Sequence, residues 1–295
     1  MWPRLPRILC VFVRHTQKLP ELLASENPLA RVEDVELTAS DGALLRGTFA
    51  VPERQSGSAV ILLHGISDNR MGVSGFARLF LANGYRVLLV DSRAQGTSGG
   101  AFATYGVLER DDVHRWLDWL EKDQTENCVF GFGESMGAAI LLQSLENESR
   151  FCAIVAESAF STFREATYER IGRFTRTGRW AQYLARPFTE IAYRYFKWRY
   201  GPDLEAANPI DTVSRSRTPI LLIHGQADRN VLPFNSEEIL AASHGNTELW
   251  RVTGAGHCGA WSTEPEEFQK RVLEWFDAHQ APIHGCGTAT SRLGS

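Results

Sequence analysis

The residues best suited to covalent chemistry begin with a serine between two glycines. Ser135 lies in Gly133-Glu-Ser-Met-Gly137, directly after the apolar residues 128–132 and before residues 138–145, which favour helix. A serine at a strand-to-helix turn has a strained backbone and a projecting hydroxyl. Strand and helix pass so closely there that only glycine fits two residues before and two after it. Ser135 is therefore the candidate nucleophile.

A second serine has the same glycine spacing, in Gly96-Thr-Ser-Gly-Gly100. Such a short pattern is weak evidence by itself, because glycine and serine are common residues. Ser98 lies several residues beyond the strand that ends near Asp91, and residues 101–105 do not open a helix. We therefore predict that Ser98 is a loop residue.

A serine hydroxyl needs an imidazole base, and the imidazole needs an acid that fixes its tautomer. Asp228 follows the apolar segment that ends at Ile223, and His257 follows the last predicted strand in a glycine-flanked loop. Ligands and catalytic groups gather at the carboxyl ends of parallel strands. The sequence therefore predicts Ser135 as nucleophile, His257 as base and Asp228 as the orienting acid.

Other acids and histidines compete for these roles. Asp228 could instead close an Asx turn, and Glu157, just past the strand that ends at Ala156, is a rival acid. His64 and His224 each precede a glycine at a strand end, and we interpret both as loop-shaping residues.

Acyl transfer also needs donors for an oxyanion, and backbone amides are the usual source. One candidate is the amide of Met136, directly after the nucleophile at a helix N-terminus. The other is the amide of Ile66, in the loop that follows the strand ending at Leu63.

The elements that position these residues alternate between strand and helix. Continuous apolar runs are typical of strands covered on both faces, and they occur at residues 59–63, 85–90, 128–132, 152–156 and 219–223. Residues 32–37 and 44–49 alternate around Asp41-Gly42, which indicates an antiparallel hairpin. The pattern predicts an α/β fold with a mostly parallel, doubly wound sheet and an antiparallel N-terminal hairpin.

The chain divides into four parts on this interpretation. Residues 1–30 form an N-terminal arm, residues 31–160 and 209–280 form the core, residues 161–208 form a helical lid insertion, and residues 281–295 form a disordered tail. The lid segment is rich in aromatic and basic residues. Its aromatic side chains could pack on the sheet edge, or the segment could form an amphipathic surface for anionic lipid or acidic acyl substrates.

Composition narrows the function classes. The chain has 295 residues and a net charge of −4, without a Gly-rich phosphate loop or cysteines at metal-ligand spacing. We therefore expect a small-molecule partner, no nucleic acid, no cofactor and no metal. Five cysteines without C-x-x-C spacing, with Cys128 and Cys152 acting as small hydrophobic residues, favour a reducing compartment. The apolar run at residues 8–13 is too short for a signal sequence or a membrane span.

Five motifs in this order resemble those of the α/β-hydrolase superfamily. They are His64-Gly65, residues 91–98 (Asp-Ser-Arg-Ala-Gln-Gly-Thr-Ser), residues 133–137, residues 224–228 and Gly256-His257. The chain is similar to small esterases, and to serine-aminopeptidase-like or acylglycerol-lipase-like hydrolases with a short helical lid. It departs from them at Ala94, where relatives usually have glycine, so the geometry of that loop is in question.

The resemblance implies a serine hydrolase that cleaves carboxylic esters through an acyl-enzyme, and the aromatic lid favours medium or long acyl chains. The alternatives are a thioesterase or serine peptidase with the same triad, or a non-catalytic relative that binds lipid or protein. The expected location is cytoplasmic, or at a membrane surface contacted by the lid or the N-terminal arm.

Overall fold

A computed structural model describes residues 19–26, 31–122, 128–146, 148–174 and 179–280 of the chain. The tail predicted at residues 281–295 and most of the N-terminal arm lie outside the described residues. The described part of the arm contains helix α2 (Leu19–Glu26), whose Leu19 and Leu23 are buried against the core.

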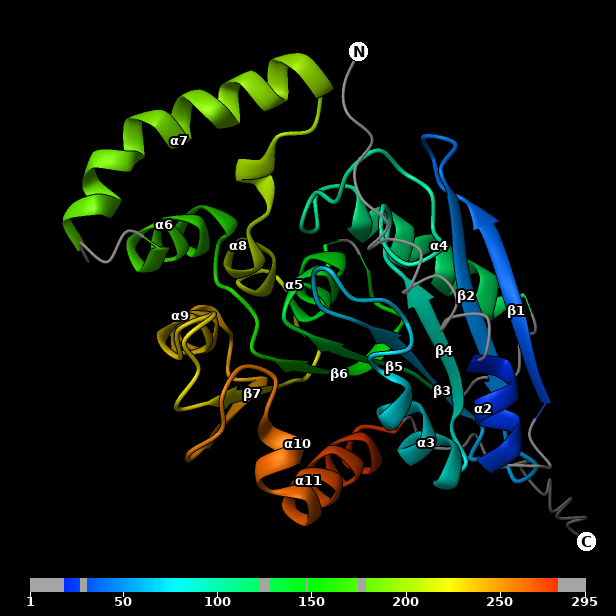
Figure 1. The fold of residues 1–295 in the computed structure, drawn as a ribbon. Coiled ribbons are helices and arrows are strands. Elements are labelled where there is room, and N and C mark those ends of the chain that lie inside the picture. Colours follow the sequence, from blue (N-terminus) through cyan, green and yellow to red (C-terminus); the bar gives the residue numbers. More distant parts are fainter. Residues whose placement is uncertain (1–18, 27–30, 123–127, 147, 175–178, 281–295) are drawn as a thin grey trace, which may run out of the picture.

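One eight-stranded sheet organises the fold, in the order β1-β2-β4-β3-β5-β6-β7-β8 (Figure 1). β1 pairs antiparallel with β2, and β2 with β4, whereas every other neighbouring pair is parallel. The predicted mostly parallel sheet with an antiparallel entry hairpin is confirmed. The strands are β1 (Arg31–Thr38), β2 (Leu44–Val51), β3 (Ser58–Leu63), β4 (Arg86–Asp91), β5 (Cys128–Glu134), β6 (Phe151–Glu157), β7 (Ile220–Gly225) and β8 (Thr247–Val252).

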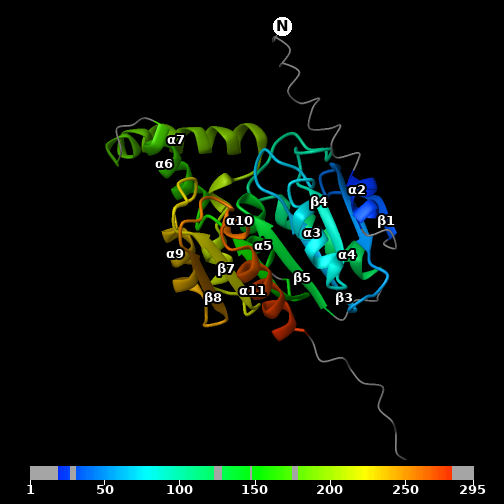
Figure 2. The same cartoon turned by 60° about the horizontal axis from the view of Figure 1, so that its bottom comes forward.

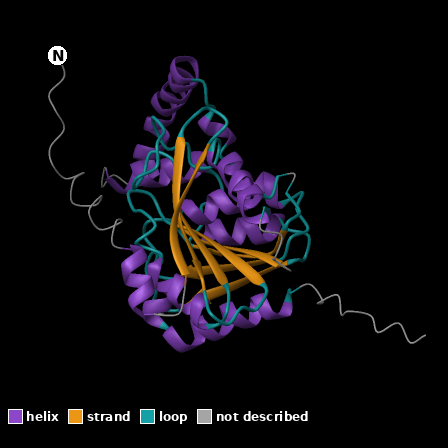
Figure 3. Ribbon diagram, turned by 90° about the vertical axis from the view of Figure 1, so that its right-hand side faces the viewer, coloured by secondary structure: helices purple, strands orange, loops and turns teal. Residues whose placement is uncertain are grey.

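Helices cover both faces of this sheet, as Figure 3 shows. One face packs against α2, α3 and α11, and the other packs against α4, α5, α8 and α9. Successive residues of β3 alternate between the two apolar cores, with Val60 and Leu62 in one and Ile61 and Leu63 in the other. The helices are α3 (Ser74–Ala82), α4 (Glu109–Glu121), α5 (Met136–Ser144), α8 (Pro209–Val213), α9 (Phe234–Ala242), α10 (Ala260–Thr263) and α11 (Pro265–Ala278).

The segment between β6 and α8 contains two long helices and a short one. These are α6 (Phe163–Phe174), α7 (Arg179–Tyr200) and the 3-10 helix η1 (Leu204–Ala206). Figures 1 and 2 both show α7 on the outside of the molecule, with α6 beside it on the inner side. The segment therefore adds helical structure at one end of the sheet.

Two cysteines that were expected to be unpaired are joined in the structure. Cys128 and Cys152 form a disulfide between β5 and β6, with their Cα atoms 5.7 Å apart. The prediction of unpaired cysteines was wrong because β5 and β6 are adjacent parallel strands, which brings together two residues far apart in sequence. Disulfides persist mainly in oxidising environments, so this pair removes the cysteine argument for a reducing compartment.

The loop after β4 contains an alanine in a conformation that favours glycine. Ala94 has φ +58° and its amide donates to the carbonyl of Gly99 at 2.7 Å. The left-handed region costs a residue with a Cβ about 1–2 kcal/mol. The loop therefore keeps its hydrogen bond at the expense of local strain, which a glycine at position 94 would relieve.

Ala94→Gly should stabilise the protein by about 0.5–1 kcal/mol, because relief of the strain exceeds the entropy cost of an added glycine. Urea-induced unfolding measures this change. Ala101→Gly is the matched control: Ala101 is also exposed but lacks a positive φ, so it should bring only the entropy cost. Equal destabilisation by both substitutions would contradict strain at Ala94.

Candidate functional site

The turn between β5 and α5 holds Ser135 in a strained conformation. Its φ and ψ are 52° and −114°, and its amide donates to the carbonyl of Glu157 at 2.8 Å. A Cβ on Gly133 would lie 2.6 Å from the carbonyl carbon of Gly137, and one on Gly137 would lie 2.4 Å from the carbonyl oxygen of Leu63. Both glycines are therefore required by close backbone contact.

Three side chains far apart in sequence meet at the carboxyl edge of the sheet. Nε2 of His257 lies 2.8 Å from Oγ of Ser135, and its Nδ1 lies 2.7 Å from Oδ2 of Asp228. With the Nδ1 proton donated to the carboxylate, Nε2 is left as an acceptor for the hydroxyl proton. The arrangement can abstract a proton from Ser135.

Asp228 is a buried carboxylate with several donors. Its Oδ1 accepts the amides of Asn230 and Val231 at 2.7 and 3.1 Å, and its Oδ2 lies 3.4 Å from Nε2 of His224. Burial alone would raise its pKa, but the bonds from His224 and His257 hold the pKa of Asp228 well below its usual value. Asp228 therefore stays ionised while buried.

The two other strand-end histidines hold loops in place. The ring of His224 accepts the hydroxyl proton of Ser236 at 2.6 Å and donates to the carbonyl of Val231 at 3.0 Å. Nε2 of His64 accepts the amide of Ser92 at 3.1 Å, and burial lowers the pKa of His64. These contacts agree with the interpretation of both as loop-shaping residues.

Backbone hydrogen bonds tie the loop of Asp228 to the loop of His257. The amides of Gln226 and Ala227 donate to the carbonyls of Val252 and Ala255 at 2.9 and 2.8 Å. A Cβ on Gly225 would lie 2.4 Å from the carbonyl oxygen of Ala255, so the loops can approach only with glycine there. The separation between carboxylate and imidazole is therefore set by the backbone.

Glu157, the rival acid, contacts the base loop at a different point. Its Oε1 accepts the amide of Ala260 at 2.9 Å, and its Oε2 has no hydrogen-bond partner among the described residues. Burial raises the pKa of Glu157 to about 7, and burial next to Glu157 and Asp68 raises the pKa of Glu134 to about 9. Burial likewise raises the pKa of the Cys258 thiol. Asp228, not Glu157, bonds the imidazole.

The two predicted oxyanion donors border the same cavity as Ser135. This cavity has a volume of about 470 Å³, and Ile66 and Met136 both line it. Within the described residues neither backbone amide donates to an acceptor, so both are free to bind a ligand oxygen. The structure thus brings the two candidate donors to the candidate nucleophile.

Gln95 supports this arrangement, and sequence reasoning assigned it no role. Its Oε1 accepts the amide of Ser67 at 2.6 Å, and its Nε2 lies 3.6 Å from Sδ of Met136. Ser67, next to Ile66, has φ +63°, so this bond holds a strained residue of the loop. The position of Gln95 in the motif at residues 91–98 was its only sequence signal. In the same motif, Ser98 donates to the carbonyl of Asp91 at 2.7 Å, which agrees with its predicted loop role.

Helix α6 forms the outer wall of the cavity at Ser135. It contributes Phe163, Ala166, Thr167, Arg170 and Ile171, and the rest of the lining includes Tyr105, Phe160 and Val231. The rings of Tyr105 and Phe163 stack with centroids 4.0 Å apart. The wall is mainly apolar, with one arginine.

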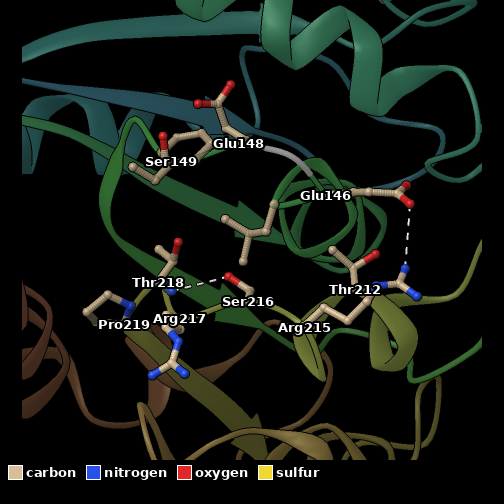
Figure 4. A pocket seen from close by; sticks show the side chains of 11 residues that line it. Glu146, Glu148, Ser149, Thr212, Arg215, Ser216, Arg217, Thr218 and Pro219 are labelled. Carbon is tan, nitrogen blue, oxygen red and sulfur yellow. Dashed lines mark hydrogen bonds and ion pairs between the residues drawn. The ribbon is translucent and has the colours of Figure 1, made fainter.

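A second cavity, of about 570 Å³, lies at the opposite edge of the sheet, where β6 and β7 begin (Figure 4). Glu146 and Arg215 pair at 3.5 Å on one side of it. It is lined by none of the three residues that meet at the carboxyl edge. We assign it no part in the chemistry at Ser135.

The raised pKa of Glu157 predicts a pH-dependent stability. Protonated Glu157 stabilises the folded state relative to ionised Glu157. This stabilisation is fully present below about pH 4.5, the pKa of an unperturbed glutamate, and is lost as the pH rises through about 7. Glu157→Gln cannot ionise, so its free energy of unfolding relative to wild type should rise by about 1–3 kcal/mol between about pH 5 and about pH 8.

Chemical denaturation across that pH range measures the difference. The exposed Glu238→Gln serves as control, because its side chain remains in water and the variant should follow wild type. A Glu157→Gln profile parallel to that of wild type would show that Glu157 is ionised throughout.

The chain is similar in sequence and in structure to known proteins. The chain is 25% identical over 232 residues to the YqkD protein of Bacillus subtilis (strain 168), covering 78% of this chain and 74% of YqkD. It is 21% identical to the uncharacterized peptidase YuxL of the same strain, covering 86% of this chain but only 40% of YuxL.

Among solved structures, the Pyrococcus furiosus esterase Pf2001 superposes with a TM-score of 0.70 and 26% identity, covering 89% of this chain and 94% of the esterase. The model of the alpha/beta hydrolase family matches residues 60–270, which include most of β3, the Ser135 turn, Asp228 and His257. The chain therefore belongs to the alpha/beta hydrolase family.

Proposed function

We propose that this hydrolase cleaves carboxylic esters through an acyl-enzyme on Ser135. The observation that carries the proposal is the hydrogen-bonded chain from Asp228 through His257 to Ser135. The similarity to an esterase across 89% of this chain supports the same reaction class.

In the proposed mechanism, Oγ of Ser135 attacks the ester carbonyl carbon while Nε2 of His257 takes the hydroxyl proton. The amides of Ile66 and Met136 then donate to the oxyanion, and His257 returns the proton to the leaving alcohol. Asp228 stabilises the imidazolium that forms in between. Water, activated by the same imidazole, then attacks the acyl carbon and releases the acid.

The acid in this mechanism can be tested by substitution. Asp228→Asn should lower kcat for a p-nitrophenyl ester by about 10⁴-fold, because the amide favours the wrong imidazole tautomer. Glu157→Gln is the matched control, since its side chain bonds the backbone of Ala260 and should leave most activity intact. If Glu157→Gln lost activity and Asp228→Asn retained it, Glu157 would be the orienting acid.

Labelling with a fluorophosphonate probe tests the nucleophile. Wild type should label and Ser135→Ala should not, with thermal unfolding as the check that both are folded. An unlabelled wild type would favour a non-catalytic binding protein instead.

The apolar wall of the cavity supports medium or long acyl chains as substrates. Each buried methylene contributes about 0.8 kcal/mol, so kcat/KM should rise about fourfold per methylene from acetate until the cavity is filled. Ala166→Phe, which places a ring in the cavity, should lower turnover of the octanoate ester more than that of the acetate ester. A series that peaks at acetate in wild type would contradict this substrate class.

A peptidase is the second candidate, on the observation that the chain is similar to the peptidase YuxL. The same three side chains could attack an amide or a thioester as well as an ester. Turnover of matched ester, thioester and aminoacyl-amide substrates by one preparation distinguishes these activities.

A further inference from the structure

The outward face of α7 carries a stripe of exposed apolar side chains. Its members lie four, three, four and three residues apart along the helix, and their exposed fractions range from 55% to 80%. At 100° per residue they fall within about 80° of arc and span about 21 Å of helix. They are Leu184, Phe188, Ile191, Tyr195 and Trp198, which we call the α7 stripe.

The opposite face of the same helix is the one that packs. Tyr193 is buried and its hydroxyl donates to Oγ1 of Thr167 on α6 at 2.7 Å. The ring of Phe196 packs on Phe102 with centroids 5.0 Å apart. The α7 stripe is therefore not used to hold α7 on the molecule. A contiguous exposed apolar patch of this kind indicates an interaction surface.

The charge of α7 is opposite to that of the whole chain. The helix has five arginine or lysine residues and one glutamate, whereas the chain has a net charge of −4. Arg194 and Arg199 are exposed and flank the stripe on either side at helical spacing. The single acid, Glu190, is bound by Tyr168 and by Arg164. The outward face therefore combines apolar and positive groups.

These two properties together select the partner. A second copy of this chain would bring two positive helices together, whereas an anionic lipid surface complements both the charge and the apolar stripe. Tryptophan and tyrosine are also favoured at the boundary between headgroups and acyl chains. No helix in the described part of the chain is long and apolar enough to cross a bilayer.

We propose that the α7 stripe docks the protein on an anionic lipid bilayer, with the helix lying in the plane of the interface. Arg194 and Arg199 contact lipid headgroups, and the stripe enters the acyl boundary. α6, which forms the outer wall of the Ser135 cavity, then lies between the bilayer and the sheet (Figure 1). The docking does not depend on the reaction proposed for that cavity.

Vesicle flotation with the 295-residue chain tests the proposal. The protein should float with phosphatidylcholine vesicles that contain about 30 mol% phosphatidylglycerol, and much less with phosphatidylcholine alone. Binding should weaken as salt rises from about 0.05 to about 0.5 M, because salt screens surface charges. The double variant Phe188→Ser with Trp198→Ser should reduce vesicle binding at least about tenfold. The double variant Arg194→Gln with Arg199→Gln should reduce it about fivefold for each charge removed.

The matched control is Phe234→Ser, which removes an exposed aromatic ring from α9 and should leave vesicle binding unchanged. Unchanged ester turnover and thermal unfolding show that each variant is folded. The proposal would be overturned if the wild type did not bind vesicles, or if the Phe188/Trp198 variant bound them as well as the wild type. A wild-type dimer in light scattering that these substitutions dissociate, with no vesicle binding by either protein, would show that the α7 stripe binds a second copy of the chain instead.

Discussion

A buried charge is the interaction on which the site depends. Asp228 is an ionised carboxylate out of contact with water, and such a group is costly unless donors surround it. Two backbone amides, His224 and His257 supply those donors. The hydrogen bond between His257 and Asp228 stabilises the buried carboxylate and also orients the imidazole toward Ser135.

The backbone around that charge leaves little freedom. Ser135 is held in a left-handed conformation by the bond to Glu157, and the acid and base loops are bonded to each other through their amides. Gly133, Gly137 and Gly225 permit the close approaches, because a Cβ at any of them would overlap backbone atoms. Glu157 lies near Asp228, and burial raises the pKa of Glu157. These contacts define the backbone geometry of the site at the carboxyl edge of the sheet.

The segment between β6 and α8 contributes to two surfaces, each through a different helix. α6 contributes the wall of the Ser135 cavity, and α7 packs on it through Tyr193 while its opposite face remains exposed. A surface helix needs only one apolar face to pack on the protein. The second apolar face of α7 is therefore not explained by folding. One wall of the Ser135 cavity and the α7 stripe therefore belong to the same segment of the chain.

The sequence by itself determined the local features. Apolar runs predicted the strands and glycine spacing predicted the turn at Ser135, because both signals depend on neighbouring residues. The order Ser, Asp, His along the chain identified the side chains that meet, because each follows a predicted strand end. Only the tertiary structure decided that Cys128 bonds Cys152, that Gln95 holds the loop of Ile66, and which face of α7 remains exposed. Those outcomes depend on strand order and helix packing, which join residues that no sequence spacing relates.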